Sequence, residues 1–215
     1  MKKYELTAEF IEKWGKKLFR IKALISFGSV EVGELGGYVE KEDNLAQDGN
    51  AWVYGNARVC GNAWVYGNAR VCGDAEVYGN AEVYGDAEVY GNARVCGDAW
   101  VYGNARVYGN AEVYGNARVY GNAEVYGDAE VCGNADYLLI GRIGSRFSFT
   151  TFFKNKDKGI TVSCGCFLGT IAEFRAKVSD THGNNKHAKI YNLAADMAEL
   201  QILGEEYFDK FEVRS

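Results

Sequence analysis

The central part of the chain repeats its apolar and polar positions with a period of six residues. Val recurs at every sixth position from Val53 to Val131, and Ala recurs likewise from Ala51 to Ala135. The unit reads Gly-Asn/Asp-Ala-x-Val-Tyr/Cys, and no insertion breaks its phase. A short period with one small residue, one branched aliphatic residue and a Gly-Asn corner is typical of a parallel β-helix.

Each hexapeptide predicts a short strand, Ala-x-Val, followed by a corner. Ala and Val are two positions apart, so both point to the same side of the strand, which we take as the interior. The x residue and the Tyr or Cys are also two apart and are predicted to point outward. Gly, with an Asn or Asp that tolerates a positive φ, is suited to the corner.

The charges at the x positions indicate how many hexapeptides close one coil. With three hexapeptides per coil, seven stacked pairs are charged at both ends and six of them are opposite in sign. With two hexapeptides per coil only three pairs in eight are opposite, and with four only three in six. Neighbouring opposite charges stabilise a sheet and like charges destabilise it. The charges therefore favour a coil of three hexapeptides, or about 18 residues, which makes a triangular prism with three faces.

One outer face of this prism is predicted to be aromatic. Stacked tyrosines can simply stiffen a sheet, but a large exposed apolar patch usually marks a contact surface. The two interpretations are compatible, and the second predicts a homo-oligomer. The candidate interface residues are Trp64, Tyr66, Tyr84, Trp100, Tyr102 and Tyr120.

The segments on either side are not repetitive, so three domains are expected: 1–50, 51–135 and 136–215. Residues 3–6 and 17–24 read as strands of a β-rich cap, and residues 36–39 as an irregular first coil. After Ala135 we predict a small α+β domain with three strands, at 137–140, 147–153 and 160–167.

Two helices complete the predicted C-terminal domain. Thr170 and Glu173 form a capping box that should open a helix through about Thr181, ended by Gly183. A second helix is predicted over 186–203. Its broad apolar face would consist of Ala188, Tyr191, Leu193, Ala194, Met197, Ala198, Leu200 and Ile202.

Composition narrows the class of function. The net charge of −5 argues against a general nucleic-acid-binding surface. No apolar run reaches the roughly 18 residues of a membrane span, and the N-terminus lacks the apolar core of a signal peptide, so we expect a cytoplasmic protein. The six Cys show no spacing typical of a disulfide framework. Cys60 and Cys96 would lie two coils apart, which is too far for a disulfide.

The repeat resembles the hexapeptide repeats of the left-handed β-helix family, whose best-known members are trimeric acyltransferases. The resemblance covers 51–135 and implies a left-handed coil. Enzymes of that family use a His as general base. The chain has only two, His182 and His187, and neither lies in the repeat 51–135. The flanks, at 35–40, 141–146, 163–167 and 181–188, resemble uncharacterised bacterial and phage hexapeptide-repeat proteins, which assigns no activity.

The candidate chemistry is concentrated in the C-terminal domain, around Cys164, Cys166, His182 and His187. In one interpretation the Cys pack in the core and the His cap helices. In a second the four form a zinc site, although Cys-x-Cys is tighter than the usual spacing. In a third the domain binds a small anion through guanidinium, hydroxyl, imidazole and amide groups. The residues of this third site are Arg142, Ser145, Arg146, His182, Asn184 and His187.

Together these features predict a mainly β protein that acts as a non-catalytic, self-associating β-helical scaffold without a cofactor. Its C-terminal domain would bind a protein partner or a small anionic ligand, and the phage resemblance makes a host component one such partner. The alternatives are an acyltransferase of the hexapeptide-repeat type and a structural module that forms filaments.

Overall fold

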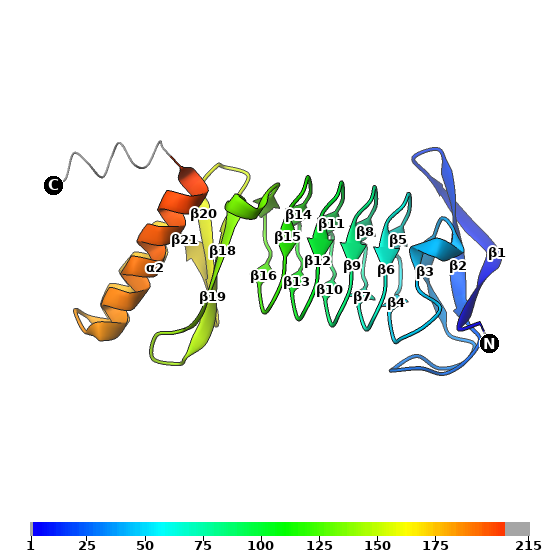
Figure 1. Cartoon of the computed structure of the whole chain (residues 1–215), viewed down its shortest axis with the longest axis horizontal. Coiled ribbons are helices and arrows are strands. Elements are labelled where there is room, and N and C mark those ends of the chain that lie inside the picture. The colour runs from blue at the N-terminus through cyan, green and yellow to red at the C-terminus, as the bar shows by residue number, and fades with distance from the viewer. Residues whose placement is uncertain (1, 205–215) are drawn as a thin grey trace.

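The computed structural model describes residues 2–204 and shows an elongated, mainly β molecule. A β-solenoid of about five turns forms the middle of the molecule. An N-terminal β-unit closes one end, and a small sheet with two helices closes the other (Figure 1). Among the described residues no helix is long and apolar enough to cross a membrane.

The solenoid strands are two residues long, and each consists of an x residue and its Val. The Ala before each strand and the Val within it are fully buried, as predicted, from Ala51 to Val131. The strands are β4 (Trp52–Val53), β5 (Arg58–Val59), β6 (Trp64–Val65), β7 (Arg70–Val71), β8 (Glu76–Val77), β9 (Glu82–Val83), β10 (Glu88–Val89), β11 (Arg94–Val95), β12 (Trp100–Val101), β13 (Arg106–Val107), β14 (Glu112–Val113), β15 (Arg118–Val119), β16 (Glu124–Val125) and β17 (Glu130–Val131).

The strands stack in parallel into three sheets, one per face of the solenoid. Their orders are β5-β8-β11-β14-β17, β4-β7-β10-β13-β16 and β6-β9-β12-β15, the first being continuous with the N-terminal strands. Arg94 lies opposite both Glu76 and Glu112, so each paired residue is 18 positions from its partner. Ion pairs of 3.4–3.8 Å join several of these columns. The like-charged Glu112 and Glu130 also face each other.

Glycines make the corners because the backbone φ is positive there and successive corners stack closely. Gly103 has a φ of +70°, and a Cβ built on it would lie 3.1 Å from the backbone N of Gly121 in the next coil. The adjacent Asn and Asp side chains form hydrogen-bonded ladders: Asn68 Nδ2 donates to Asp86 Oδ1 at 2.9 Å. The corners are therefore fixed by backbone geometry and by side-chain amides.

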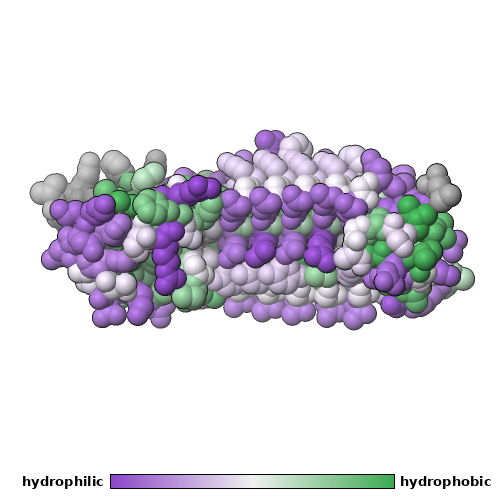
Figure 2. Space-filling view, turned by 90° about the horizontal axis from the view of Figure 1, so that it is seen from below, coloured by the Kyte–Doolittle hydropathy of each residue, from purple (hydrophilic) through white to green (hydrophobic). Residues whose placement is uncertain are grey.

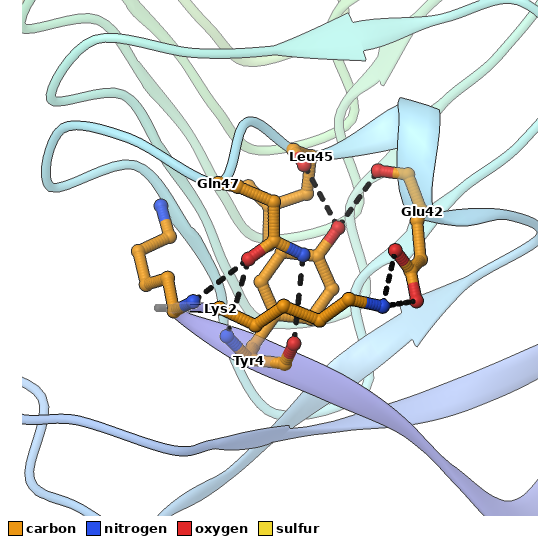
Figure 3. A network of polar contacts seen from close by, with 6 residues as sticks. Lys2, Tyr4, Glu42, Leu45 and Gln47 are labelled. Carbon is orange, nitrogen blue, oxygen red and sulfur yellow. Dashed lines mark hydrogen bonds and ion pairs between the residues drawn. The ribbon is translucent and has the colours of Figure 1, made fainter.

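The N-terminal unit extends one face of the solenoid and covers its open end. Strands β1 (Tyr4–Lys13), β2 (Lys16–Ala23) and β3 (Leu35–Val39) are antiparallel, and β3 pairs in parallel with β5. The first strand is longer than predicted. A short 3-10 helix, η1 (Glu42–Asn44), follows, and the Tyr4 hydroxyl donates to the backbone oxygens of Glu42 and Leu45 at 2.7 and 2.8 Å (Figure 3).

This unit buries side chains that were predicted to point into solvent. Trp52 is 0% exposed because Tyr4 and Phe27 pack edge-on against its ring. Cys60 is buried against Leu18 and Tyr38. The outward direction was correct, but sequence alone did not reveal that the cap folds over this part of the surface.

The C-terminal sheet has four antiparallel strands where three were predicted: β18 (Tyr137–Ile143), β19 (Ser148–Lys154), β20 (Ile160–Cys164) and β21 (Phe167–Thr170). The apolar run 160–167 is broken because Gly165 adopts a φ of +61° and turns the chain. A 3-10 turn, η2 (Asn134–Asp136), joins this sheet to the solenoid.

Alternation along β19 explains how the sheet caps the solenoid. Phe153 belongs to the solenoid core, whereas Phe152 packs among the helices. Helices α1 (Ile171–His182) and α2 (Lys186–Leu203) cover the second face, with the predicted Thr170–Glu173 capping box in place. The predicted apolar face of α2 is only partly buried. Ala188, Tyr191, Ala194, Ala198 and Ile202 pack inward, whereas Leu193, Met197 and Leu200 lie exposed.

Candidate functional site

A cavity of about 230 Å³ opens at the outer edge of the C-terminal unit. Two turns form one side, the β18–β19 turn and the β20–β21 turn at Gly165, while α1 and α2 form the other. The residues that line it are Ser145, Arg146, Ser148, Cys164, Gly165, Cys166, Phe167, Phe174, Lys177, Val178, Thr181, His182 and Tyr191.

The polar groups of the cavity are cationic or neutral. Arg146 and Lys177 are exposed at its rim, and His182 is half-buried. No Asp or Glu belongs to the lining. Ser145, Ser148 and Thr181 add hydroxyl groups that can donate or accept hydrogen bonds. This set of groups favours an anion over a cation.

The apolar residues of the lining are rigidly placed. Phe174, Val178 and Tyr191 are buried, and Tyr191 packs edge-on against Phe174 at 5.7 Å between centroids. Gly144 makes room for this ring, because a Cβ built there would overlap the Tyr191 hydroxyl. Burial raises the pKa of the Tyr191 hydroxyl, and the neighbouring Cys164 thiol adds to the rise. The hydroxyl therefore stays protonated at neutral pH.

The two histidines flank the turn between the helices, as the sequence predicted. The His182 ring stacks on Tyr191 at 5.7 Å and lies 5.8 Å from the ring of His187. Asn185 caps α2 by accepting hydrogen bonds from the backbone N–H groups of His187 and Ala188. Within residues 2–204, the buried Nδ1 of His187 has no hydrogen-bond partner.

The structure brings together half of the predicted anion site. Ser145, Arg146 and His182 line the cavity, whereas Arg142 and Asn184 are exposed outside its lining. His187 contacts His182 but does not line the cavity itself.

Lys177 and Tyr191 were missed. Lys177 could have been found from the helical spacing. Val178 is one turn before His182 on the predicted first helix, and the neighbouring Lys177 is one turn before Thr181, so all four lie on one side of the helix. Tyr191 was assigned only to an apolar face.

The zinc interpretation lacks a set of ligands. Cys164 and Cys166 both line the cavity with His182, yet among residues 2–204 no three His, Cys, Asp or Glu side chains are grouped closely enough to hold a metal ion. The Cys164 sulfur instead accepts a hydrogen bond from the Thr150 hydroxyl at 3.2 Å. All six cysteines are free thiols.

The predicted aromatic face forms a continuous ladder. Tyr66, Tyr84, Tyr102 and Tyr120 stack with centroids 4.7, 4.9 and 5.3 Å apart. Trp64 stacks on Tyr66 at 4.0 Å, and the Arg118 guanidinium lies 4.4 Å from the Trp100 ring. Trp64 and Tyr120 remain 43% and 48% exposed.

The match to known protein families lies in the solenoid. The family model described as YdcK beta solenoid repeat matches residues 51–67, 87–103, 99–115 and 111–127. These segments cover less than half of the chain, and they support a repeat β-solenoid protein. No curated protein matches the chain. The cavity lies outside every matched segment.

Proposed function

We propose that this protein is a non-catalytic, self-associating scaffold whose C-terminal unit binds a small anionic ligand in the Arg146 cavity. The observation that carries this proposal is the cavity lining, which holds Arg146, Lys177 and His182 beside a buried aromatic floor and includes no Asp or Glu. Asp180, outside the lining, pairs with Lys177 at 3.4 Å. Guanidinium and ammonium groups near hydroxyls are suited to phosphate or carboxylate oxygens.

The size of the cavity limits the ligand. At about 230 Å³ it is smaller than the range of roughly 300–1,000 Å³ typical of pockets for drug-sized molecules. Inorganic phosphate or a small phosphate ester fits this volume better than a complete dinucleotide. The Phe174 and Tyr191 rings favour an ester with a flat apolar group. A protein partner for this unit, including a host component, stays a prediction.

The scaffold part of the proposal includes a left-handed coil of three hexapeptides. The pairing of Arg94 with Glu76 and Glu112 supports the coil length. The left hand rests on the resemblance to hexapeptide-repeat proteins. A core of Val and Ala, with charge pairs on the outside, makes a rigid support.

Self-association is supported by exposed apolar side chains on two surfaces: Trp64 and Tyr120 on the aromatic ladder face, and Leu193 and Met197 on the outer side of α2. Acyl transfer and filament formation stay predictions, because no contact among residues 2–204 favours either over binding.

Calorimetry on the full chain tests the ligand part. Inorganic phosphate and phenyl phosphate are the probes, and phenyl phosphate is expected to bind more tightly because its ring can rest on the aromatic floor. Arg146→Ala should weaken phenyl phosphate binding at least tenfold. Arg142→Ala is the matched control, since it removes an exposed Arg from the preceding strand and should leave binding unchanged.

Two outcomes contradict the ligand proposal. If neither phosphate nor phenyl phosphate gives heat at millimolar concentration, the proposed anion site is wrong. Equal losses in both Arg variants would assign any binding to general surface charge. A titration with acetyl-CoA distinguishes acyl transfer, because a bound acyl carrier would favour that alternative.

A further inference from the structure

Helix α2 places its apolar residues in an unexpected order. It buries Ala188, Ala194, Ala195 and Ala198, together with Tyr191 and Ile202. Four larger aliphatic side chains lie on its outside instead and are 39%, 62%, 56% and 40% exposed: Ile190, Leu193, Met197 and Leu200. A helix on a monomer usually turns its large apolar side chains toward the core and its small or polar ones toward water.

The inner face explains why small residues are buried there. Alanines let α2 approach the sheet closely, and Tyr191 reaches the space that Gly144 leaves open. The outer face is at the far end of the molecule, where α2 is the last element and no described element covers it (Figure 1). Figure 2 shows rows of polar surface along the solenoid, strongly hydrophobic surface over the N-terminal unit, and a mixture of hydrophilic and hydrophobic surface over the C-terminal unit.

The exposed residues follow the spacing of a coiled-coil seam. The intervals from Ile190 to Leu193, Met197 and Leu200 are three, four and three residues, as at alternating a and d positions. We call these four residues the α2 seam. Side chains at this spacing insert into gaps on a facing helix, so the seam fits a helix better than a loop or a small ligand.

The spacing also identifies which helix fits. Three-four-three reads the same in both directions, so a two-fold axis level with residue 195 makes the seam complementary to itself. In that arrangement Ile190 of each copy faces Leu200 of the other, and Leu193 faces Met197. Every layer then pairs an a position with a d position. Self-complementarity of one patch is the requirement of a symmetric dimer interface.

The charges beside the seam are compatible with antiparallel pairing. With the axis level with residue 195, Lys186 and Lys189 of one copy lie level with the uncharged Gly204 and Gln201 of the other, so no like charges face each other there. Near the axis, Asp196 is bound by the Arg175 guanidinium of α1 at 2.7 Å, which offsets repulsion between the two copies. Antiparallel helices also align their dipoles favourably.

We infer that the α2 seam is the surface through which two copies of this chain pair, as antiparallel α2 helices. The inference rests on the self-association part of the proposed function and assigns it to a surface other than the aromatic ladder. The dimer places the two solenoids on opposite sides of the helix pair. Each Arg146 cavity keeps its own complete lining.

Sedimentation velocity of the full chain from 1 to 200 µM tests the inference. A reversible dimer is expected, and Leu193→Lys should raise its dissociation constant at least thirtyfold. Leu168→Lys is the matched control, because Leu168 is an exposed Leu on β21 away from the seam. Trp64→Ser tests the ladder. Both should leave the dimer intact, and circular dichroism should show that all variants are folded.

Cross-linking tests the antiparallel arrangement. In a background with the exposed Cys132 and Cys166 replaced by Ser, a mixture of Ile190→Cys and Leu200→Cys chains should form a disulfide dimer on mild oxidation. Ile190→Cys alone should not, because its two copies would lie about 15 Å apart along the helix axis.

The results that overturn the inference differ from those that overturn the ligand proposal. A monomer at 200 µM, or a dimer lost in Trp64→Ser and kept in Leu193→Lys, excludes the seam. A monomeric full chain that dimerises once truncated after Gly204 would show that residues 205–215 occupy the seam instead. Phenyl phosphate binding, measured on the same preparations, reports on the cavity alone.

Discussion

The solenoid and the C-terminal unit solve the same packing problem in opposite ways. In the solenoid each hexapeptide places its Val and Ala in the same buried environment, and opposite charges pair along two of the three faces. In the C-terminal unit no environment repeats. Two cationic side chains and a histidine gather there around one cavity, and large aliphatic residues remain outside.

The difference shows where function can be located in a repeat protein. A regular surface repeats similar groups along successive coils and gathers few different ones at one place. Irregular segments at the end bring together residues from two turns and two helices, as at Arg146, Lys177 and His182. In the proposed function the solenoid supplies rigidity and the end unit supplies specificity.

The largest effect is expected from a charge inside the solenoid. Val95→Asp places a carboxylate in a fully buried position without a partner and should cost more than about 4 kcal/mol of stability. Leu168→Asp, on the exposed side of β21, should change stability by less than about 0.5 kcal/mol. Thermal and urea unfolding followed by circular dichroism compare the two. Equal effects would contradict a tightly packed solenoid core.

The next prediction compares the stability lost at a corner that stacks on another coil with that lost at a corner that does not. Gly103→Ala and Gly127→Ala share a positive φ, but only the first would bring its Cβ near another backbone, at 3.1 Å from Gly121 N. Both should lose about 1–2 kcal/mol from backbone strain. Gly103→Ala should lose about 1 kcal/mol more from the close contact. Identical unfolding midpoints would show that corner stacking is adaptable.

A smaller effect is expected from the charge columns. Arg106 lies 3.4 Å from Glu88 and 3.6 Å from Glu124, so Arg106→Glu creates like charges on both sides. We expect a loss of about 1 kcal/mol at low salt that shrinks in 0.5 M NaCl. Arg142→Glu, on the exposed end of β18, should be neutral. A loss independent of salt would indicate that Arg106 acts through packing.

The last prediction concerns a loss of stability that begins only above about pH 10. Burial between Tyr90 and Tyr126 raises the pKa of the Tyr108 hydroxyl, and the charge of Glu124 adds to the rise. The unfolded chain releases this proton near pH 10, so the folded form is favoured below pH 10 and loses that advantage as pH rises further.

Absorbance at 295 nm and circular dichroism follow tyrosinate formation and unfolding together. The two signals should change in one step above pH 10, and Tyr108→Phe should reduce the pH dependence of the step. Ionisation of Tyr108 near pH 10 in the folded protein would contradict a pKa raised by burial.

The solenoid was predictable because its pattern is long and redundant. Inward Val and Ala, outward charges and Gly corners all follow from a six-residue period, and the charge pairs indicated which strands are neighbours. The α1 start at Thr170 was equally predictable, because a capping box is a local signal. The folding of the cap over Trp52 and Cys60 was not predictable, since it depends on residues between 22 and 48 positions away.

The sequence by itself determined the interior, the corners and the charge pairing of the solenoid, because each depends on residues close in the repeat. Only the tertiary structure decided that Lys177 and Tyr191 join Arg146 and His182, and that α2 turns Leu193 and Met197 outward. Several faces of α2 are apolar enough to be buried. The face that packs inward was selected by how closely its alanines could approach the sheet, which is a property of two surfaces together and of neither sequence segment alone.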